Sequence, residues 1–217
     1  MSDLRLQSVS LYLGRTPLIE NLTLHIEPTQ VVTLMGESGV GKSTLLAFIC
    51  GTLEPAFTAR GRVTVDDDEI TGLAPERRRV GILFQDDLLF PHLSVGDNLA
   101  FGLSPHSRGA ERRARISAAL EEAGLAGFEA RDPATLSGGQ RARVALMRTL
   151  LAEPRVLLLD EPFSRLDAIT RARFRAFVFD HARNRGIPTL MVTHDPDDAR
   201  ATGDRVVELR THPAAPD

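Results

Sequence analysis

Residues 36–43 of this chain read Gly36-Glu37-Ser38-Gly39-Val40-Gly41-Lys42-Ser43, between an apolar run at residues 31–35 and a helical apolar pattern at residues 43–50. The spacing G-x-x-x-x-G-K-[ST], after a buried strand and before a helix, is that of a phosphate-binding loop. Its glycines let successive backbone N–H groups converge on phosphate oxygens, and the helix N-terminus adds partial positive charge. We expect Lys42 to reach the β- and γ-phosphates and the Ser43 hydroxyl to ligate Mg²⁺.

The segments around this loop alternate between strand and helix patterns. Residues 4–12 and 22–26 alternate apolar and polar side chains, which is typical of half-buried strands and predicts a small β layer. Further strands are predicted at residues 31–35, 63–65, 80–84, 156–159, 189–193 and 206–209, and helices at residues 43–50 and 168–184. Continuous apolar strands separated by helices favour a mainly parallel sheet covered on both faces.

The strand signal is missing between residues 86 and 153. Residues 111–124 place Ile116, Ala119, Leu120 and Ala123 on one helix face, and residues 141–152 are strongly helical. We therefore expect an α/β phosphate-binding-loop fold in one domain of 217 residues. Its core would comprise residues 1–85, with an N-terminal antiparallel β layer, and residues 154–217. Residues 86–153 would form an inserted α-helical subdomain.

The composition is that of an ordinary globular protein, because 42% of the residues are hydrophobic and 25% are charged. The net charge is −3, so we read the arginine clusters as solvated helix faces and expect no nucleic-acid partner. No basic and apolar leader opens the sequence, and no apolar run approaches the roughly 18 residues that span a bilayer, which predicts a cytoplasmic protein. Cys50 is the only cysteine, which excludes an internal disulfide.

Two acids, Asp160 and Glu161, close the apolar run at residues 156–159. Ligands of open α/β sheets bind at the carboxyl ends of the strands. Asp160 is suited to hold Mg²⁺, and Glu161 is then free to orient and polarise a water for attack on the γ-phosphate. The alternative, two acids that cap the next turn, is disfavoured by the nearby phosphate loop.

A second anion site is predicted at Leu136-Ser137-Gly138-Gly139-Gln140, which precedes the helical residues 141–152. Ser137, Gly138 and Gly139 would present a hydroxyl and backbone N–H groups at a helix N-terminus. The phosphate loop already surrounds its own nucleotide, so this site is most economically placed against nucleotide bound by another subunit. Taken alone, the stretch also fits a flexible helix entry.

The phosphate loop and the residues 136–140 together resemble the ATP-binding-cassette (ABC) ATPases, over essentially the whole chain. The resemblance implies that Gln85 is the Q-loop glutamine, which contacts metal and attacking water, and that His194 is the switch histidine at the γ-phosphate. It implies that Tyr12, the only tyrosine in a chain without tryptophan, stacks on adenine. Residues 164–167 resemble the D-loop, with Arg165 where the family more often has a small residue.

The expected site therefore has three groups of residues. Catalytic roles fall to Glu161, His194 and Gln85, and metal binding falls to Ser43, Gln85 and Asp160. ATP would be bound by Tyr12, Gly36, Glu37, Ser38, Gly39, Val40, Gly41, Lys42, Ser43, Thr44, Ser137, Gly138, Gly139 and Gln140. Taken singly, Gln85 could be a surface amide, His194 a neighbour of a helix cap and Tyr12 a core residue, but their order and spacing favour the functional roles.

The stretch at residues 83–95 with Asn98 resembles ATP-binding subunits of bacterial binding-protein-dependent importers, most closely the compact thiamine-type and YnjD-type subunits. This implies a second ATP-binding subunit, with a homodimer favoured. It also implies an integral membrane permease docked on the region from Gln85 to Leu93, a solute-binding protein, and a place on the cytoplasmic face of the inner membrane. Two alternatives stay open at this point: a soluble ABC ATPase that is not part of a transporter, and a nucleotide-gated binding module with little turnover.

Overall fold

The computed structural model describes residues 2–209 and divides the chain into two compact units. The core unit comprises the described residues up to 82, residues 155–161 and the described residues from 179 onward. The helical unit comprises residues 83–154 and 162–178. It contains the expected insertion, but also residues 162–178, which the sequence pattern assigns to the core. Periodicity predicts a helix there, but not the unit against which its apolar face packs.

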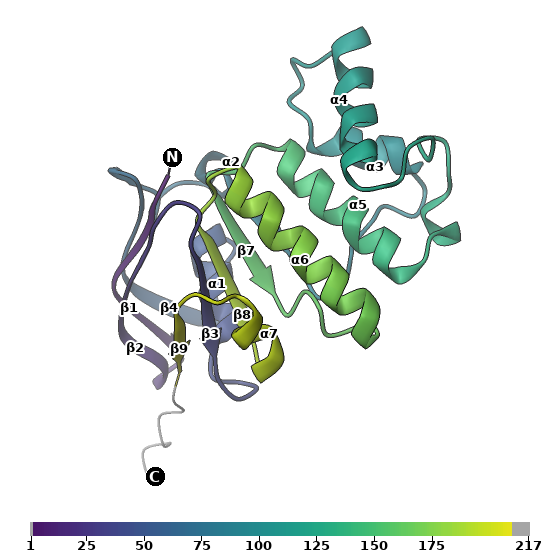
Figure 1. Cartoon of the computed structure of the whole chain (residues 1–217). Coiled ribbons are helices and arrows are strands. Elements are labelled where there is room, and N and C mark those ends of the chain that lie inside the picture. The colour runs from purple at the N-terminus through teal and green to yellow at the C-terminus, as the bar shows by residue number, and fades with distance from the viewer. Residues whose placement is uncertain (1, 210–217) are drawn as a thin grey trace. The chain divides into compact units, whose positions relative to one another are not determined.

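An antiparallel sheet opens the core unit, in the strand order β2-β1-β4-β5 (Figure 1). Its strands are β1 (Leu4–Leu13), β2 (Thr16–Ile26), β4 (Phe57–Val65) and β5 (Asp68–Glu69). Strands β2 and β4 are longer than predicted, because polar residues such as Arg60 and Arg62 continue the strand on its exposed side.

Strand β1 contains a bulge beside Ser8. The pairing of β1 with β4 shifts register between Gln7 and Ser10, and Ser8 has a φ of 49°. Across from it lies Gly61, with a φ of 101°, where an added Cβ would lie 2.7 Å from the Ser8 carbonyl oxygen. One extra residue in a strand moves every later side chain to the opposite face.

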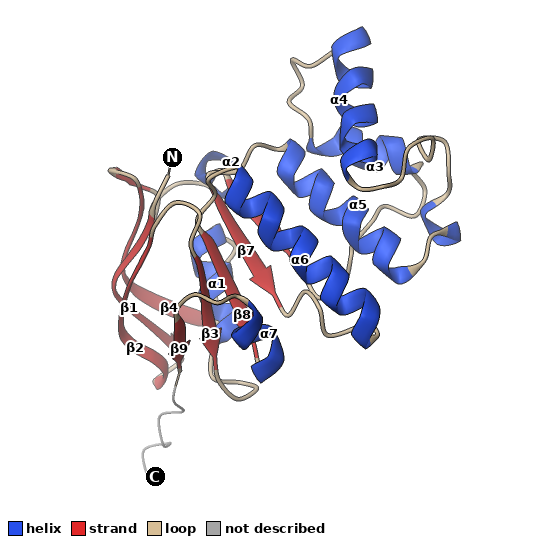
Figure 2. Cartoon of the chain, in the orientation of Figure 1, coloured by secondary structure: helices blue, strands red, loops and turns tan. Residues whose placement is uncertain are grey.

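A five-stranded sheet forms the centre of the core unit, in the order β6-β7-β8-β3-β9 (Figure 2). Its strands are β3 (Val31–Met35), β6 (Val80–Leu83), β7 (Val156–Asp160), β8 (Thr189–Thr193) and β9 (Val206–Glu208). Strand β8 pairs in parallel with β3 and β7, and β3 pairs in parallel with β9. The central strands are continuously apolar because both of their faces are buried, and the predicted parallel sheet is confirmed.

The helices of the core unit are α1 (Lys42–Cys50), α2 (Pro75–Arg78) and α7 (Pro196–Ala201). One apolar core, which includes Leu4, Leu34, Leu45 and Leu158, joins the two sheets and α1. The buried Arg78 guanidinium donates to the carbonyl oxygens of Phe48 and Ile49 in the last turn of α1, where unpaired carbonyls collect.

The helical unit contains α3 (Val95–Gly102), α4 (Gly109–Glu122), the 3-10 turn η1 (Pro133–Thr135) and α5 (Gly138–Leu151). Helix α6 (Ala168–Asn184) belongs to this unit as far as residue 178, and Phe174 meets Phe163 edge to face with ring centroids 5.8 Å apart. Helix α3 packs on α5 so closely that a Cβ at Gly102 would collide with the Arg148 carbonyl oxygen. As predicted, no strand lies within residues 86–153 of the described chain.

Within residues 2–209, no helix combines the length and the apolar character that spanning a bilayer requires.

Candidate functional site

The phosphate loop connects β3 to α1 in the core unit, as predicted. Gly39 and Gly41 have φ angles of 87° and 96°, a conformation that favours glycine. A Cβ at Gly41 would also lie only 3.1 Å from Cβ of Leu18 on β2. The loop therefore approaches β2 closely, and its backbone N–H groups remain available at the start of α1.

Lys42 is held inside this loop. Its side chain is only 6% exposed, and its ammonium group donates to the carbonyl oxygens of Gly36 and Glu37 at 2.6 and 2.9 Å. A buried cation that is bonded to neutral carbonyls gains strongly from a nearby anion. The structure thus presents Lys42, together with the loop N–H groups, as a receptor for phosphate.

Ser43 and Asp160 meet at the end of β7. The Ser43 hydroxyl donates to Oδ1 of Asp160 at 3.1 Å. Burial raises the pKa of Asp160, and the nearby charge of Glu161 adds to this rise, whereas the Ser43 hydrogen bond and Lys42 oppose it. A hydroxyl and a partly buried carboxylate are hard oxygen donors, so this pair fits Mg²⁺ held jointly with phosphate oxygens.

Glu161 and His194 lie at the carboxyl ends of the adjacent strands β7 and β8. His194 Nδ1 and Glu161 Oε1 are 2.9 Å apart, and the Glu161 N–H donates to the Val192 carbonyl oxygen at 3.0 Å. Glu161 has a φ of 47°, which is unusual for a residue with a side chain and typical of functional positions. Two groups that can exchange a proton are therefore fixed beside the phosphate loop.

A pocket of about 380 Å³ is lined by the phosphate loop and Glu161, and its size suits a small ligand. Its lining includes the predicted catalytic residue Glu161. It also includes six residues predicted to bind ATP: Ser38, Gly39, Gly41, Lys42, Ser43 and Thr44. Of the other predicted loop positions, Gly36 and Glu37 hold Lys42 through their carbonyls, and Val40 is buried.

Tyr12 is not among the residues that line this pocket, and its role at adenine stays a prediction. The apolar lining consists instead of Leu13, Leu18 and Phe57. The guanidinium carbon of Arg60 lies over the Tyr12 ring, 6.0 Å from the ring centroid. The bulge in β1 is the physical reason, because it moves Tyr12 to the face opposite Leu11 and Leu13.

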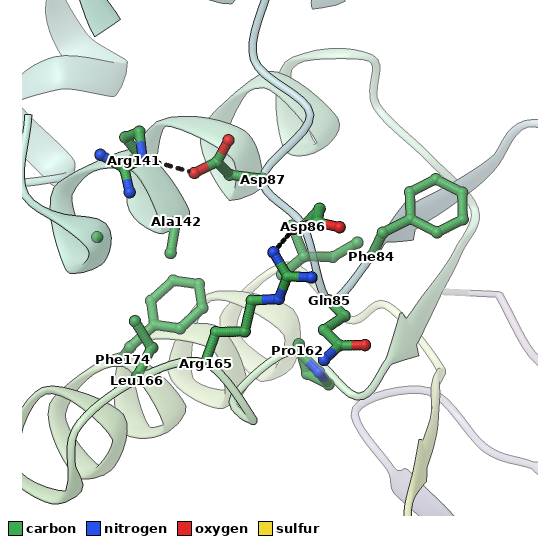
Figure 3. Close-up of a pocket in the computed structure, with 12 residues that line it drawn as sticks. Phe84, Gln85, Asp86, Asp87, Arg141, Ala142, Pro162, Arg165, Leu166 and Phe174 are labelled. Atoms are coloured by element: carbon green, nitrogen blue, oxygen red, sulfur yellow. Dashed lines mark hydrogen bonds and ion pairs between the residues drawn. The ribbon is translucent and has the colours of Figure 1, made fainter. Parts of the chain in front are cut away.

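Gln85 lines a second pocket, of about 310 Å³, in the helical unit. In Figure 3 it lies on the same side of this pocket as Pro162, and Arg165 points at Asp86, with which it forms an ion pair. Gln85 lies in the helical unit, whereas Lys42, Glu161 and His194 lie in the core unit. The Arg165–Asp86 pair joins the segments after β6 and before α6, a contact that the sequence pattern does not contain.

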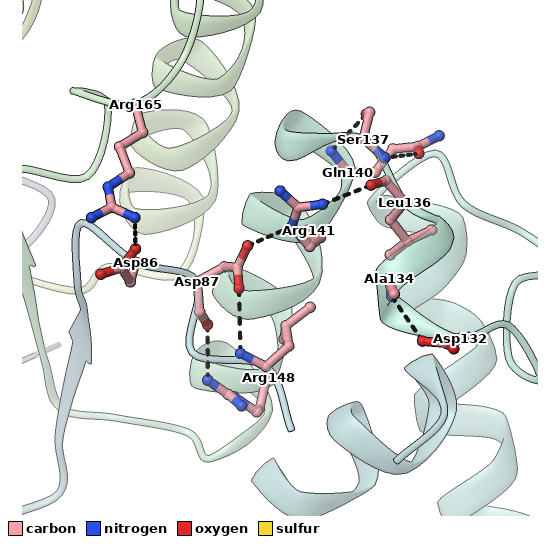
Figure 4. Close-up of polar contacts among 11 residues, drawn as sticks. Asp86, Asp87, Asp132, Ala134, Leu136, Ser137, Gln140, Arg141, Arg148 and Arg165 are labelled. Atoms are coloured by element: carbon pink, nitrogen blue, oxygen red, sulfur yellow. Dashed lines mark hydrogen bonds and ion pairs between the residues drawn. The ribbon is translucent and has the colours of Figure 1, made fainter. Parts of the chain in front are cut away.

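Ser137 and Gln140 form a capping box at the start of α5 (Figure 4). The Ser137 Oγ accepts from the Gln140 N–H at 3.3 Å, and the Gln140 Oε1 accepts from the Ser137 N–H at 2.9 Å. The Ser137 hydroxyl keeps its own proton for donation, and the N–H groups of Gly138 and Gly139 have no intrahelical acceptor in the first turn. Three donors at the helix end thus have no intrahelical acceptor, whereas the side-chain carbonyl of Gln140 accepts from the Ser137 N–H.

The two glycines of this helix end differ in their surroundings. A Cβ at Gly139 would lie 2.5 Å from Cγ2 of Thr170, whereas a Cβ at Gly138 would meet Leu166 at an ordinary 3.8 Å. Gly139 is thus required by packing on α6, and Gly138 is free of that requirement. Asp167 caps α6 in the same region, and the hydrogen bonds from Thr170 lower the pKa of Asp167.

Comparison with known proteins places these features in one family. A family model described as ABC transporter matches residues 19–164. The chain is similar to the uncharacterized ABC transporter ATP-binding protein YnjD of Escherichia coli K12, with 48% identity over 195 residues and 90% of each chain covered.

Two importer subunits with named substrates are similar as well. Identity to the thiamine import ATP-binding protein ThiQ of Rhizobium meliloti is 47% over 83% of this chain and 75% of that protein. Identity to the Fe(3+) ions import ATP-binding protein FbpC 1 of Haemophilus influenzae is 42% over 94% of this chain. The matched region spans only 62% of that protein's length.

Proposed function

This chain belongs to the ABC transporter family, as an ATP-binding subunit of the import type. We propose that it uses ATP to power solute uptake through a separate membrane permease. The protein binds and hydrolyses ATP. The proposal treats residues 1–217 as one nucleotide-binding domain, whose core carries the phosphate loop and whose helical part carries the second anion site.

The pair of Glu161 and His194 beside Lys42 is the observation that carries this proposal. Hydrolysis needs a carboxylate near the γ-phosphate to orient a water and a second group to hold the phosphate in line. In the core unit the two side chains are 2.9 Å apart, and Glu161 lines the same pocket as Lys42 and Ser43.

The proposed reaction divides the work among these residues. Glu161 orients the water and accepts its proton as the water oxygen bonds to the γ-phosphorus and the bond to ADP breaks. His194 holds the γ-phosphate and keeps Glu161 in position through their hydrogen bond. Lys42 stabilises the negative charge on the β- and γ-phosphate oxygens.

The metal in this proposal is Mg²⁺, which Ser43 and Asp160 of the core unit would hold. When bound, Mg²⁺ neutralises charge on the phosphate oxygens. The Ser43–Asp160 hydrogen bond of 3.1 Å supports the assignment, since it brings two hard oxygen donors together.

The active form is proposed to be a head-to-tail homodimer with ATP between the subunits. Ser137, Gly138 and Gly139 of one copy would donate to the phosphates held by Lys42 of its twin. The donors at the start of α5 support this, because a helix N-terminus stabilises anions. In a Glu161→Gln background, ATP should produce dimers in light scattering, and Gly138→Phe should abolish them. Gly72→Phe is the matched control, because Gly72 lies in open space.

The permease is proposed to dock on the helical unit near residues 85–93. Phe84, Leu88 and Phe101 are large apolar side chains that are 42%, 54% and 68% exposed, and all three belong to this unit. An apolar surface that contains such side chains would be typical of a protein interface. The subunit would then work at the cytoplasmic face of the membrane, and a solute-binding protein would deliver cargo to the permease from the other side.

Steady-state phosphate release tests the central step. We expect Glu161→Gln to keep ATP binding and lose hydrolysis by a factor of about 10² to 10⁴. Glu27→Gln, an exposed carboxylate in the turn after β2, should keep the wild-type rate. Undiminished turnover in Glu161→Gln would reject Glu161 as the base.

A further inference from the structure

We propose that Arg141 is a positioning residue for the second anion site, and that it holds this site from an anchor at Asp87. This inference rests on the proposed function, since the site acts only where the phosphates of a bound nucleotide reach Ser137, Gly138 and Gly139. All five residues belong to the helical unit.

Arg141 makes two hydrogen bonds to different segments from a position near the start of α5 (Figure 4). Its Nη1 donates to the carbonyl oxygen of Leu136 at 2.8 Å, and its Nε donates to Oδ2 of Asp87 at 2.8 Å. Leu136 is buried and directly precedes Ser137. Arg141 therefore ties the entry of the second anion site to the segment that follows Gln85.

The peptide group between Leu136 and Ser137 is held at both of its ends. The Ser137 N–H donates to the side-chain oxygen of Gln140 at 2.9 Å, and the Leu136 carbonyl oxygen of the same peptide group accepts from Arg141. A peptide group is planar, so these two bonds together fix the rotation of its plane. That plane sets the direction in which the Ser137 side chain leaves the backbone. Arg141 thus controls where the Ser137 hydroxyl points.

The anchor at Asp87 is itself held in place. Its Oδ1 accepts from the Leu89 N–H at 3.4 Å, and Arg148 donates to the carbonyl oxygens of Asp87 and Leu88 at 3.3 and 2.9 Å. Arg148 follows Arg141 by two helical turns, so both arginines lie on the same face of α5. Two arginines of one helix face therefore hold this segment against α5.

The charge of Asp87 distinguishes positioning from direct attraction of phosphate. The side chains of Asp87 and Arg141 are 29% and 38% exposed, so water screens their charges only in part. If Arg141 bound the anion directly, removal of the negative charge at Asp87 would strengthen the site. If Arg141 positions the peptide group before Ser137, the same change weakens the site, because the guanidinium loses its anchor. The proposal therefore predicts losses of the same sign for both partners.

Light scattering of the full chain in the Glu161→Gln background tests this, through the ATP concentration that gives half of the dimer. Arg141→Met and Asp87→Asn should each raise this concentration by at least about threefold, because a charge-assisted hydrogen bond is lost. The double variant should exceed the larger single effect by less than about twofold, since the two residues act as one unit. Asp87→Glu keeps the carboxylate and should stay within about twofold of the reference chain.

Two controls separate this role from a general loss of structure. Arg113→Met, at an exposed position of α4, should leave the half-maximal ATP concentration within about twofold. ADP binding at the phosphate loop, followed by equilibrium titration, should stay within about twofold in Arg141→Met and Asp87→Asn. A parallel loss of ADP binding would show that Arg141 supports the fold and would overturn the positioning role.

The remaining outcomes keep this inference apart from the proposed dimer. A lower half-maximal ATP concentration in Asp87→Asn, or additive effects in the double variant, would overturn the positioning role. Dimers that form equally well in Arg141→Met would reject that role alone. Absence of ATP-driven dimers in the Glu161→Gln reference chain would instead reject the proposed dimer, and this role with it.

Discussion

Replacement of Gly139 by alanine tests the packing that holds the second anion site. The added Cβ would lie 2.5 Å from Cγ2 of Thr170, whereas carbon atoms in contact are separated by about 3.5 to 4.0 Å. The start of α5 or the Thr170 side chain must therefore move by about 1 Å. Overpacking of this kind lowers the free energy of unfolding by about 1–3 kcal/mol. Gly138→Ala meets its nearest neighbour at 3.8 Å, so we expect a change within about 0.5 kcal/mol.

Urea unfolding followed by circular dichroism measures these differences. Thr170→Ser removes the colliding methyl group but keeps the hydroxyl, so it should restore most of the stability lost in Gly139→Ala. The coupling free energy of the double mutant should then be at least about 1 kcal/mol. Equal stability of Gly138→Ala and Gly139→Ala, or an additive double mutant, would refute the reasoning from this contact.

Three further predictions concern the core unit. Lys42→Ala should weaken ATP binding at least about tenfold in equilibrium titration, because charge-assisted hydrogen bonds are lost, and unaltered affinity would contradict its role. Arg78→Met should lower the free energy of unfolding by about 1–3 kcal/mol, since the hydrogen bonds from the buried guanidinium to the Phe48 and Ile49 carbonyls are lost, whereas the exposed Arg77→Met should stay within about 0.5 kcal/mol in the same urea titration. Burial raises the pKa of the Cys50 thiol from 9.0 to about 11, although the charge of Arg78 opposes this rise. The unfolded chain therefore loses the thiol proton at a lower pH than the folded chain does. The free energy of unfolding should fall as pH rises from 9 to 11. Cys50→Ala should remove this part of the pH dependence, and an unchanged slope would show that another group causes it.

The parts of the fold that local periodicity controls were predictable from the sequence. Strands β3 and β8 and helix α6 have the predicted bounds, because continuous apolar runs and helical spacing report directly on burial. Residues 162–178 group with the helical unit, whereas the sequence pattern assigns them to the core, because the choice between two packing partners depends on tertiary contacts that periodicity does not contain.

The phosphate end of the site was predictable for a similar reason. Lys42 and Ser43 follow from a motif whose spacing fixes its own geometry, and Asp160 follows from its place at the end of an apolar strand. The structure joins Ser43 to Asp160 by a hydrogen bond. The face of β1 on which Tyr12 lies was not predictable. Tyr12 is the residue that an uninterrupted alternation through Leu4 and Leu6 directs inward, but the bulge at Ser8 reverses that alternation. The signal available in the sequence was the change of apolar positions from Leu6 to Val9, together with the glycine at position 61.

The two hydrogen bonds from Lys42 to the carbonyls of Gly36 and Glu37 have a consequence for the speed of nucleotide capture. The Lys42 ammonium group holds the loop in the conformation that binds phosphate. When a triphosphate binds, this group exchanges neutral carbonyl oxygens for charged phosphate oxygens while the loop keeps nearly the same conformation. The association rate should therefore be limited by diffusion and ionic strength, and not by a rearrangement of the loop.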